Sequence, residues 1–546
     1  MFDLIIKNGK VIDGAGNPWF KADVGINGQR ISAIGRLSAE KASKIIDADG
    51  LVVSPGFIDM HSHSDLVLLV NPKAESKIRQ GITTEVIGNC GGSAAPLNDL
   101  MKEEIRKTES LIEEAKLQLD WSTMKDYLNR LGRQGVAVNV VPLVGHANLR
   151  VCTMGFVDRA PTKTELEEMK KRLAQAMEEG AFGISTGLIY PPGCYAETDE
   201  LVELSRVVAS YGGIYASHIR DEGEKLLESV KEAIEIGEEA GLPVEISHHK
   251  AEGKANWGKV KESLKMIEDV RGRGIDITCD VYPYVASSTG LSAEIPQWAH
   301  EGGTEKLVQR LTDAETRDRL SREMREASPD RASLVEDDIW DVTQIARYKN
   351  HPDLEGKTIS EIAQTKHMDP FGLVFDLLID DAAISVVCFL MCEDDVCTVL
   401  RHPVSMIGTD GWAVAPYGVL GEGKPHPRSY GSFPRVLGKY VREERILTLE
   451  NAIRKMTSLP AQKLGLRDTG IIREGMRADI TIFNPETITD RATYQNPHQH
   501  PDGIEYVIVN GKIAVRDRGH TGVLAGQVTL PREGPAGLSS SLRIQH

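Results

Sequence analysis

Short apolar runs that end in glycine or polar residues alternate with helical segments over most of the chain. The helical segments, such as 165–180 and 224–241, place apolar residues three and four positions apart and stop at a glycine. The apolar runs are nearly continuous, as in parallel strands covered on both faces. This alternation predicts repeated βα units and therefore an α/β protein built on a (β/α)₈ TIM-like barrel. The eight candidate strands are GFIDMHSH, TTEVIGNC, VNVVPLVGH, AFGISTGL, GIYASHI, PVEISHHK, IDITCDVYPY and VSMIGTD.

The two ends of the chain have a different pattern. Residues 1–54 form short β-rich pieces separated by Asn-Gly, Asp-Gly and single glycine turn signals, and the same texture returns after residue 466. We therefore expect residues 1–54 and 466–546, the latter with a tail, to build one β-sandwich domain. The barrel then occupies residues 55–465.

The connection between the seventh and eighth candidate strands is much longer than the others. It contains EKLVQRLTDAETRDRLSREMREA, a charged amphipathic helix pattern, and predicts a helical subdomain inserted at 290–355. Loops that follow barrel strands surround the active site, so this insertion is expected to form a wall or lid. The later apolar stretch AAISVVCFLM is too short to span a membrane and predicts a buried strand.

Composition and charge narrow the class of protein. The 546 residues carry a formal net charge of −16, which disfavours nucleic acid and anionic membranes as partners. The seven cysteines are odd in number and lack the spacing of a disulfide framework. The N-terminus has no signal-peptide pattern. We expect a cytoplasmic protein that acts on a small molecule and for which an oligomer is allowed.

A His-x-His pair marks the end of the first candidate strand. Strand side chains alternate, so His61 and His63 point to the same side and are able to chelate one metal ion. The pair alone fits two hydrogen-bonded polar residues equally well. Context decides, because the carboxyl ends of barrel strands converge on one mouth. Further chemistry-bearing residues occur at the ends of other candidate strands: Cys90, His146, His218, His248 and Asp410.

Three of these residues have the donor types of a zinc site. Thiolate and neutral imidazole are good zinc ligands, which makes Cys90, His218 and His248 candidates, although a free cysteine is more often a small buried hydrophobe. Of the adjacent pair, alternation lets only one histidine face inward. We choose His248 and expect His249 to face a helix or a hydrogen-bond partner.

Two further strand-end residues receive other roles. Asp410 is placed where a carboxylate is able to touch the metal, take a proton from water and pass it to a departing amine. The alternative is a structural Asx-turn, which Thr-Asp-Gly often forms. His146 is expected near the substrate rather than on the metal.

These residues resemble the pattern of the amidohydrolase superfamily, with His-x-His on strand one, histidines on strands five and six, and aspartate on strand eight. Within it, IGNCGG, LVGHANLR, STGLIYPPG, EISHHK and HPRSYGSFPRVLG together are similar to the D-aminoacylase, or N-acyl-D-amino-acid deacylase, family. In that family a cysteine replaces the carboxylated strand-four lysine of other amidohydrolases, and AFGISTGL contains no lysine. The resemblance covers almost the whole chain.

The resemblance implies zinc-dependent hydrolysis of N-acyl-D-amino acids to a carboxylate and a free D-amino acid, with Asp410 as the catalytic proton carrier. It implies that Cys90, His218 and His248 hold one tight zinc ion. It also implies that His61, His63 and Asp410 form a second, weaker site. Tyr190, Lys250 and Arg428 are implied to bind the substrate α-carboxylate, in keeping with the bidentate grip of a guanidinium.

The sequence allows more than one class of substrate. The loop GWAVAPYGVLGEGKPHP supplies Trp412, Val414, Ala415 and Tyr417, which indicates a preference for apolar side chains. A cyclic amide, as in hydantoinases and dihydroorotases, is an alternative substrate class. A catalytically silent barrel that serves as a scaffold is a second alternative, and it would be expected to have lost metal ligands.

Overall fold

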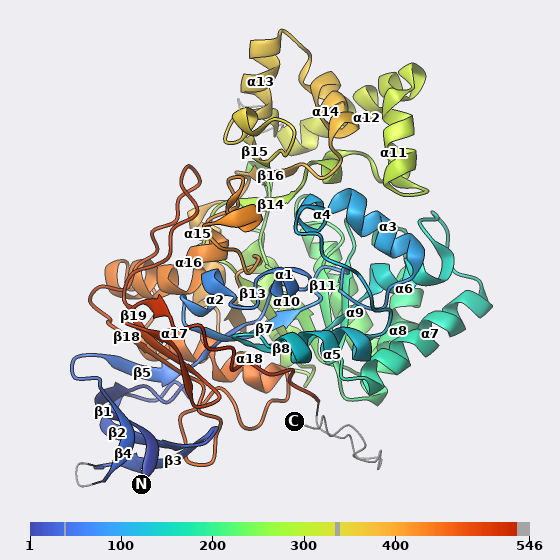
Figure 1. Ribbon diagram of the computed structural model, residues 1–546. Helices are drawn as coiled ribbons and strands as arrows, with labels where there is room; N and C mark the ends of the chain where they lie inside the picture. The colour runs from blue at the N-terminus through green and yellow to red at the C-terminus, as the bar shows by residue number, and fades with distance from the viewer. Residues whose placement is uncertain (38–39, 333–338, 532–546) are drawn as a thin grey trace.

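The computed structural model of the protein describes residues 1–37, 40–332 and 339–531. The expected tail beyond residue 531 and residues 333–338 of the expected insertion therefore lie outside the described residues. In Figure 1 a barrel occupies the middle of the molecule, the terminal strands lie at the lower left and the inserted segment lies at the top.

The barrel contains all eight predicted strands, in chain order and parallel. The ring closes where Met60 N donates to Ile407 O at 3.4 Å and where Ser62 bridges Gly411. The third strand is split in two at Leu143. The strands are β6 (Phe57–Asp59), β7 (Ile82–Ile87), β8 (Asn139–Pro142) with β9 (Val144–Gly145), β10 (Gly183–Gly187), β11 (Ile214–His218), β12 (Val244–Ile246), β13 (Ile277–Val281) and β17 (Ser405–Ile407).

Helices cover the outside of the barrel, with α7, α8, α9 and α10 packed side by side in chain order. The predicted helix at 165–180 is α7, which begins at a capping box formed by Thr162 and Glu165. The helix predicted at 224–241 is α9, which ends at Gly241 with φ 69°. The outer helices are α5 (Met124–Gln134), α6 (His146–Met154), α7 (Lys163–Glu178), α8 (Thr198–Ser210), α9 (Leu226–Ala240), α10 (Val260–Arg271), α15 (Glu393–Arg401) and α17 (Leu449–Met456).

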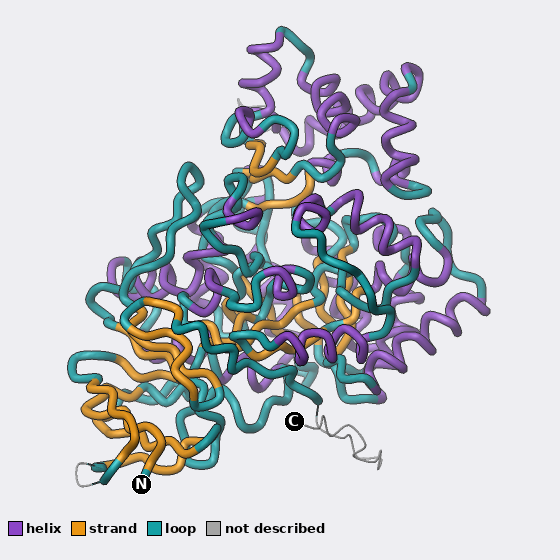
Figure 2. Tube along the Cα trace, in the orientation of Figure 1, coloured by secondary structure: helices purple, strands orange, loops and turns teal. Residues whose placement is uncertain are grey.

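Strands from both ends of the chain form one nine-stranded sheet (Figure 2). The sheet curls back on itself, because Ile31 N donates to Met476 O and Ala478 N donates to Gln29 O, both at 2.9 Å. Its two layers enclose a separate apolar core that draws on both termini. The strands are β1 (Phe2–Val11), β2 (Phe20–Asn27), β3 (Arg30–Gly35), β4 (Ala42–Asp47), β5 (Val52–Pro55), β18 (Ile480–Phe483), β19 (Ile504–Val509), β20 (Lys512–Arg516) and β21 (Gly519–His520).

The segment between β13 and β17 is longer and more mixed than the helix pattern predicts. Besides helices it holds an antiparallel sheet in the order β14-β16-β15, so it continues past residue 355 to the predicted strand β16. The single helical pattern is split in two because Asp313 accepts a hydrogen bond from Thr316 N at 2.9 Å and starts a new helix. The elements are β14 (Ser287–Gly290), α11 (Thr304–Thr312), α12 (Ala314–Ala332), β15 (Thr343–Arg347), α13 (Ile359–Lys366), α14 (Pro370–Asp380) and β16 (Ser385–Cys388).

Short helices fill the remaining connections, several of them at the barrel mouth. They are α1 (Val67–Val70), α2 (Glu75–Ile78), α3 (Asp99–Thr108), α4 (Ser110–Glu114), α16 (Arg428–Arg435) and α18 (Ser458–Lys463). Within the described ranges, none of the helices combines the length and apolar character that crossing a membrane requires.

Candidate active site

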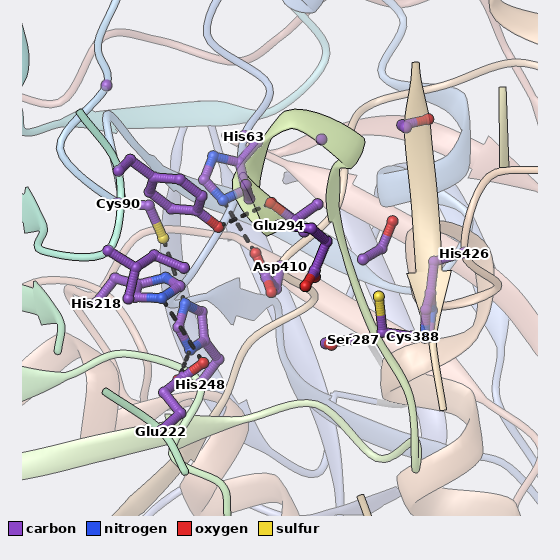
Figure 3. Close-up of a pocket in the computed structure, with 18 of the residues that line it drawn as sticks. His63, Cys90, His218, Glu222, His248, Ser287, Glu294, Cys388, Asp410 and His426 are labelled. Carbon is purple, nitrogen blue, oxygen red and sulfur yellow. Dashed lines mark hydrogen bonds and ion pairs between the residues drawn. The ribbon is translucent and has the colours of Figure 1, made fainter. Parts of the chain in front are cut away.

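The six residues predicted as metal ligands meet at the carboxyl ends of five barrel strands. They fall into two groups, in each of which all the donor atoms lie within 4.8 Å of one another. Cys90 belongs to both groups. In Figure 3 the side chains of His63, Cys90, His218, His248 and Asp410 surround one space. The first group is Cys90, His218 and His248, and the second is His61, His63, Cys90 and Asp410.

The first group draws on β7, β11 and β12. Cys90 Sγ lies 3.3 Å from His248 Nε2, and the rings of His218 and His248 meet edge to face with centroids 4.4 Å apart. Cys90 follows β7, His218 is the last residue of β11, and His248 lies two residues past β12. One thiolate and two imidazoles that leave room for another ligand are the donor set of a catalytic zinc site.

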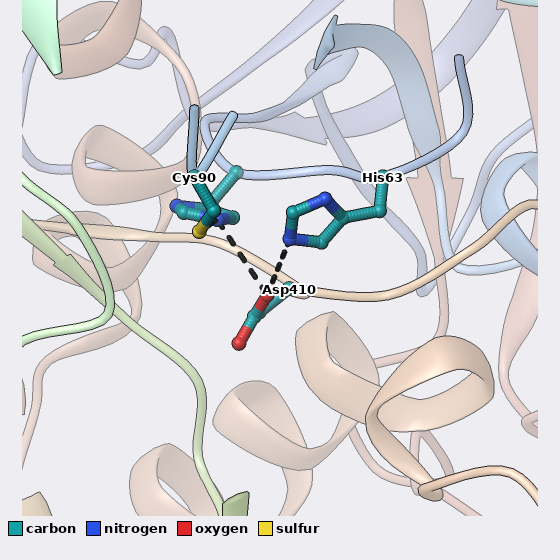
Figure 4. Close-up of side chains that lie close together, drawn as sticks. His63, Cys90 and Asp410 are labelled. Carbon is teal, nitrogen blue, oxygen red and sulfur yellow. Dashed lines mark hydrogen bonds and ion pairs between the residues drawn. The ribbon is translucent and has the colours of Figure 1, made fainter. Parts of the chain in front are cut away.

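The second group draws on β6, β7 and β17. His63 Nε2 lies 3.0 Å from Asp410 Oδ1, and His61 Nε2 lies 3.5 Å from the same oxygen and 3.3 Å from Cys90 Sγ. Figure 4 shows the ring of His63 directed toward Asp410, with Cys90 nearby. The alternation of His61 and His63 about Ser62 therefore brings both imidazoles to the same donors.

Three of the candidate ligands have strained backbone conformations. The φ angles of Cys90, His248 and Asp410 are 50°, 34° and 49°, in the left-handed region that residues with a side chain rarely adopt. Such conformations cost about 1–3 kcal/mol each and persist where the surroundings enforce them, commonly at functional sites. All three residues come just after a strand, where the chain turns to aim the side chain at the centre.

The local charges favour the ionised forms of Cys90 and Asp410. Burial raises the pKa of the Cys90 thiol, but the surrounding histidines together, His61 and His248 foremost, hold that pKa well below its usual value. Burial also raises the pKa of Asp410, but Arg428 and the neighbouring histidines together hold it well below its usual value. A thiolate and a carboxylate are the forms that bind a divalent cation.

The surroundings of His218 indicate whether these residues fit a metal ion. Its side chain is buried, yet neither ring nitrogen makes a hydrogen bond within the part of the chain that the structure describes, and Glu222 Oε2 lies 3.7 Å from Nε2. A buried polar atom without a partner is costly, and such atoms commonly mark a bound ion or water. With the thiolate of Cys90 and the ring of His248 beside it, His218 fits a metal ligand better than a structural residue.

Two carboxylates that the sequence did not single out orient the histidines. Asp280 Oδ2 lies 3.3 Å from His61 Nδ1, and Asp280 Oδ1 accepts from His248 N at 3.0 Å. Glu222 Oε1 lies 3.0 Å from His248 Nδ1. A carboxylate on one ring nitrogen leaves the other free for a metal, and such partners commonly contribute ten- to hundredfold, about 1.4–2.7 kcal/mol, to metal affinity.

The residues expected to bind the substrate lie beside the metal groups. Arg428 pairs with Asp410 Oδ2 at 2.7 Å, and Lys250 pairs with Glu222 Oε1 at 2.7 Å. Tyr190 stacks edge to face on His218 with ring centroids 5.0 Å apart. All three line the same cavity, whose volume is about 1040 Å³. A carboxylate that reaches these three groups lies next to the metal donors.

Two histidines near the site do not line the cavity among the described residues. His249 faces α10, where its Nε2 lies 2.8 Å from Ser263 Oγ, as the alternation of the strand predicts. His146 corrects our expectation of a substrate contact. It starts α6, is fully buried, lies 2.7 Å from Glu200 Oε1 and is not part of the cavity wall among the described residues.

The inserted segment forms one side of the cavity. Ser287 and Thr289 of β14 line it, and Tyr190 OH lies 3.0 Å from Thr289 Oγ1. The loop after Asp410 contributes only in part. Trp412 and Val414 line the cavity, whereas Ala415 is buried in the core and Tyr417 is exposed and bonded to Glu75. The apolar wall includes Ile295, Met324, Trp340, Phe371, Trp412 and Val414.

The known proteins most useful for comparison are amidohydrolases that match this chain over most of its length. The sequence matches the amidohydrolase family over residues 44–515. N-acyl-D-glutamate deacylase of Alcaligenes xylosoxydans xylosoxydans is 39% identical over 509 residues, which cover 93% of this chain and 93% of that protein. The structure of N-acyl-D-glutamate deacylase from Bordetella bronchiseptica, complexed with zinc and a phosphonate mimic of the tetrahedral intermediate, is 36% identical with a TM-score of 0.81, covering 96% of this chain and 99% of that one.

A third similarity concerns the metal centre. A structure of D-aminoacylase, described for its binuclear metal centre with one-metal activation and second-metal attenuation, is 37% identical with a TM-score of 0.81. It covers 97% of this chain and 99% of that one. All three proteins therefore match this chain over nearly their whole length.

Proposed function

Because this chain belongs to the amidohydrolase family, we propose that it is a zinc-dependent hydrolase that cleaves N-acyl-D-amino acids into a carboxylate and a free D-amino acid. The observation that carries the proposal is the pair of donor groups that share Cys90 beside Arg428 and Lys250. This arrangement joins a metal centre to cations for an α-carboxylate. We place the enzyme in a reducing cytoplasm, since its seven cysteines are odd in number and lack the spacing of a disulfide framework.

We assign the tight zinc position to Cys90, His218 and His248, and a second, weaker position to His61, His63 and Asp410. Bound zinc would supply a Lewis acid that polarises the acyl carbonyl and eases the ionisation of water. β10 has the sequence GISTG and offers no lysine for carboxylation, which argues against a hydantoinase-like cyclic-amide hydrolase. The full ligand set argues against a silent scaffold.

The protein side chains bind the substrate and transfer the proton. Arg428, Lys250 and Tyr190 hold the substrate α-carboxylate, which orients the amide bond toward the metal donors. Asp410 accepts a proton from the attacking water as the water oxygen bonds to the acyl carbon. Asp410 then gives that proton to the amine nitrogen as the C–N bond breaks. The 2.7 Å contact between Arg428 and Asp410 keeps the proton carrier beside the bound carboxylate.

The cavity charges favour neutral over acidic substrate side chains. An acidic substrate brings a second carboxylate, and Arg428 and Lys250 are already assigned to the α-carboxylate. Of the other lysines and arginines in the described cavity wall, the half-buried Arg220 is paired with Glu232 at 2.8 Å and Lys225 is exposed at the rim. Burying an unpaired carboxylate is costly. Together with the apolar wall, this supports a preference for apolar side chains.

A substrate series tests both the function and the preference. We expect zinc-loaded protein to hydrolyse N-acetyl-D-leucine and N-acetyl-D-phenylalanine with kcat/KM at least about thirtyfold above that for N-acetyl-D-glutamate, about 2 kcal/mol of discrimination. Release of free amino acid measures the rates. Hydrolysis that favours the glutamate derivative would refute the apolar preference alone. No hydrolysis of any of the three would refute the proposed function.

A further inference from the structure

We infer that Lys77 is a positioning residue that holds the ligand group His61, His63 and Asp410 in place, an inference that rests on the proposed function. Lys77 lies in α2, away from both groups of metal donors in the sequence, and its side chain has no exposed surface. A fully buried lysine is rare unless its charge is paired. Its partners include the residues that flank these three ligands.

The Lys77 ammonium joins the ends of β6 and β17. Its Nζ donates to Ser62 Oγ at 3.1 Å, to Thr409 Oγ1 at 2.7 Å and to Gly411 O at 2.9 Å. Ser62 stands between His61 and His63, and Thr409 and Gly411 stand on either side of Asp410. One cation therefore contacts a neighbour of each ligand in the group.

Two buried carboxylates fix the ammonium itself. Lys77 Nζ lies 2.8 Å from Asp59 Oδ2 and 3.4 Å from Glu85 Oε2, and all three side chains are fully buried. Asp59 also accepts hydrogen bonds from Thr409 N and Thr409 Oγ1, at 2.8 and 2.7 Å. Without the ammonium, Asp59 and Glu85 would be two unpaired charges in the core, which forces local rearrangement.

The geometry of Asp410 shows why this support matters. Its φ of 49° is unfavourable for a residue with a side chain, so neighbouring contacts must enforce it. Asp410 N donates to His61 O at 2.8 Å and His63 N donates to Gly411 O at 3.1 Å, which couples the two strand ends directly. Lys77 donates hydrogen bonds to both strand ends at this junction. None of the contacts described for Lys77 reaches Cys90, His218 or His248.

The test compares two buried lysines by zinc titration calorimetry of chelator-stripped, full-length protein. In K77M we expect the weaker class of zinc site to bind at least about tenfold less tightly, as for other residues that orient ligands, and the tighter class to change less than about threefold. K455M is the matched control. Lys455 is equally buried and bonds Ser405 O at 3.1 Å, where β17 begins, so both classes should stay within about threefold of the wild type.

A milder variant keeps the inference testable if K77M does not fold. T409V removes the hydroxyl that bonds both Lys77 and Asp59 at nearly constant volume, and we expect it to weaken the same class of site by a smaller factor, about threefold or more. The inference would be overturned if the variants weakened zinc binding equally at both classes of site, or weakened it at neither. It would also be overturned if the wild type had no weaker class of zinc site. These outcomes leave the deacylase function standing, whereas a wild type that binds no zinc refutes that function.

Discussion

Replacement of Cys90 by alanine is expected to remove zinc and amide hydrolysis together. Cys90 is the residue that both donor groups share, and its thiol pKa is well below the usual value, so it offers a thiolate to either position. We expect zinc affinity to fall about a hundredfold or more, beyond the effect of outer residues, and kcat/KM to fall at least about a thousandfold. Metal analysis after dialysis and a hydrolysis assay measure the two losses.

Stability provides an independent measure of the same change. Zinc that binds the folded state raises Tm by mass action, so C90A without zinc and chelator-stripped wild type should unfold at similar temperatures. The matched control is Cys152→Ala, a buried cysteine in α6 whose Sγ lies 3.6 Å from Pro96 O. That variant should keep its zinc and its activity. A C90A protein that retains wild-type zinc content would contradict the assignment of the shared ligand.

Replacement of Asp410 by asparagine is expected to separate turnover from tight metal binding. The change preserves shape but removes the carboxylate that accepts and returns the proton, so kcat should fall about a thousandfold, within the usual range for a general acid–base group. Zinc held by Cys90, His218 and His248 should remain. Steady-state kinetics with metal content determined on the same sample gives both quantities.

The control for this variant is another aspartate of the cavity wall. Asp221 accepts hydrogen bonds from Gly223 N and Lys225 N, at 2.7 and 3.1 Å, and asparagine is able to accept both. D221N should therefore stay within about threefold of the wild-type rate, as expected for a substitution that keeps its hydrogen bonds. If D410N turned over at the wild-type rate, Asp410 would not be the proton carrier.

The convergence of the candidate ligands could be predicted because two simple rules coincide. Strand alternation aligns His61 with His63, and barrel topology brings the ends of distant strands to one mouth. Cys90, His218 and Asp410 then become neighbours although they are far apart in the sequence. Neither rule depends on side-chain packing, which explains why the sequence was sufficient.

The supporting residues could not be predicted in the same way. Asp280 lies within the apolar strand ITCDV and Lys77 lies in a helix of four residues, and no spacing links either to a ligand. Their roles depend on contacts of about 3 Å between distant segments. A charged residue inside an otherwise apolar strand was the one available signal, because full burial of a charge requires a partner.

His146 shows where the strand-end rule fails. LVGHAN resembles the other ligand-bearing strand ends, but α6 begins at His146 itself and turns the ring toward Glu200 of α8. The prediction for the inserted segment was incomplete for a different reason. Its helices were visible from periodicity, whereas β14, β15 and β16 pair only through contacts between distant segments, so the sheet that lines the cavity was not foreseen.

The protein is expected to be a zinc-dependent deacylase selective for D-amino acids. The most direct measurement is hydrolysis of paired N-acetyl-D- and N-acetyl-L-amino acids, beginning with leucine and phenylalanine, with zinc content determined on the same preparation. We expect rapid hydrolysis of the D series and little hydrolysis of the L series. Chelation should remove the activity, and added zinc should restore it. Hydrolysis of the L series alone, or full activity in protein without zinc, would contradict this expectation.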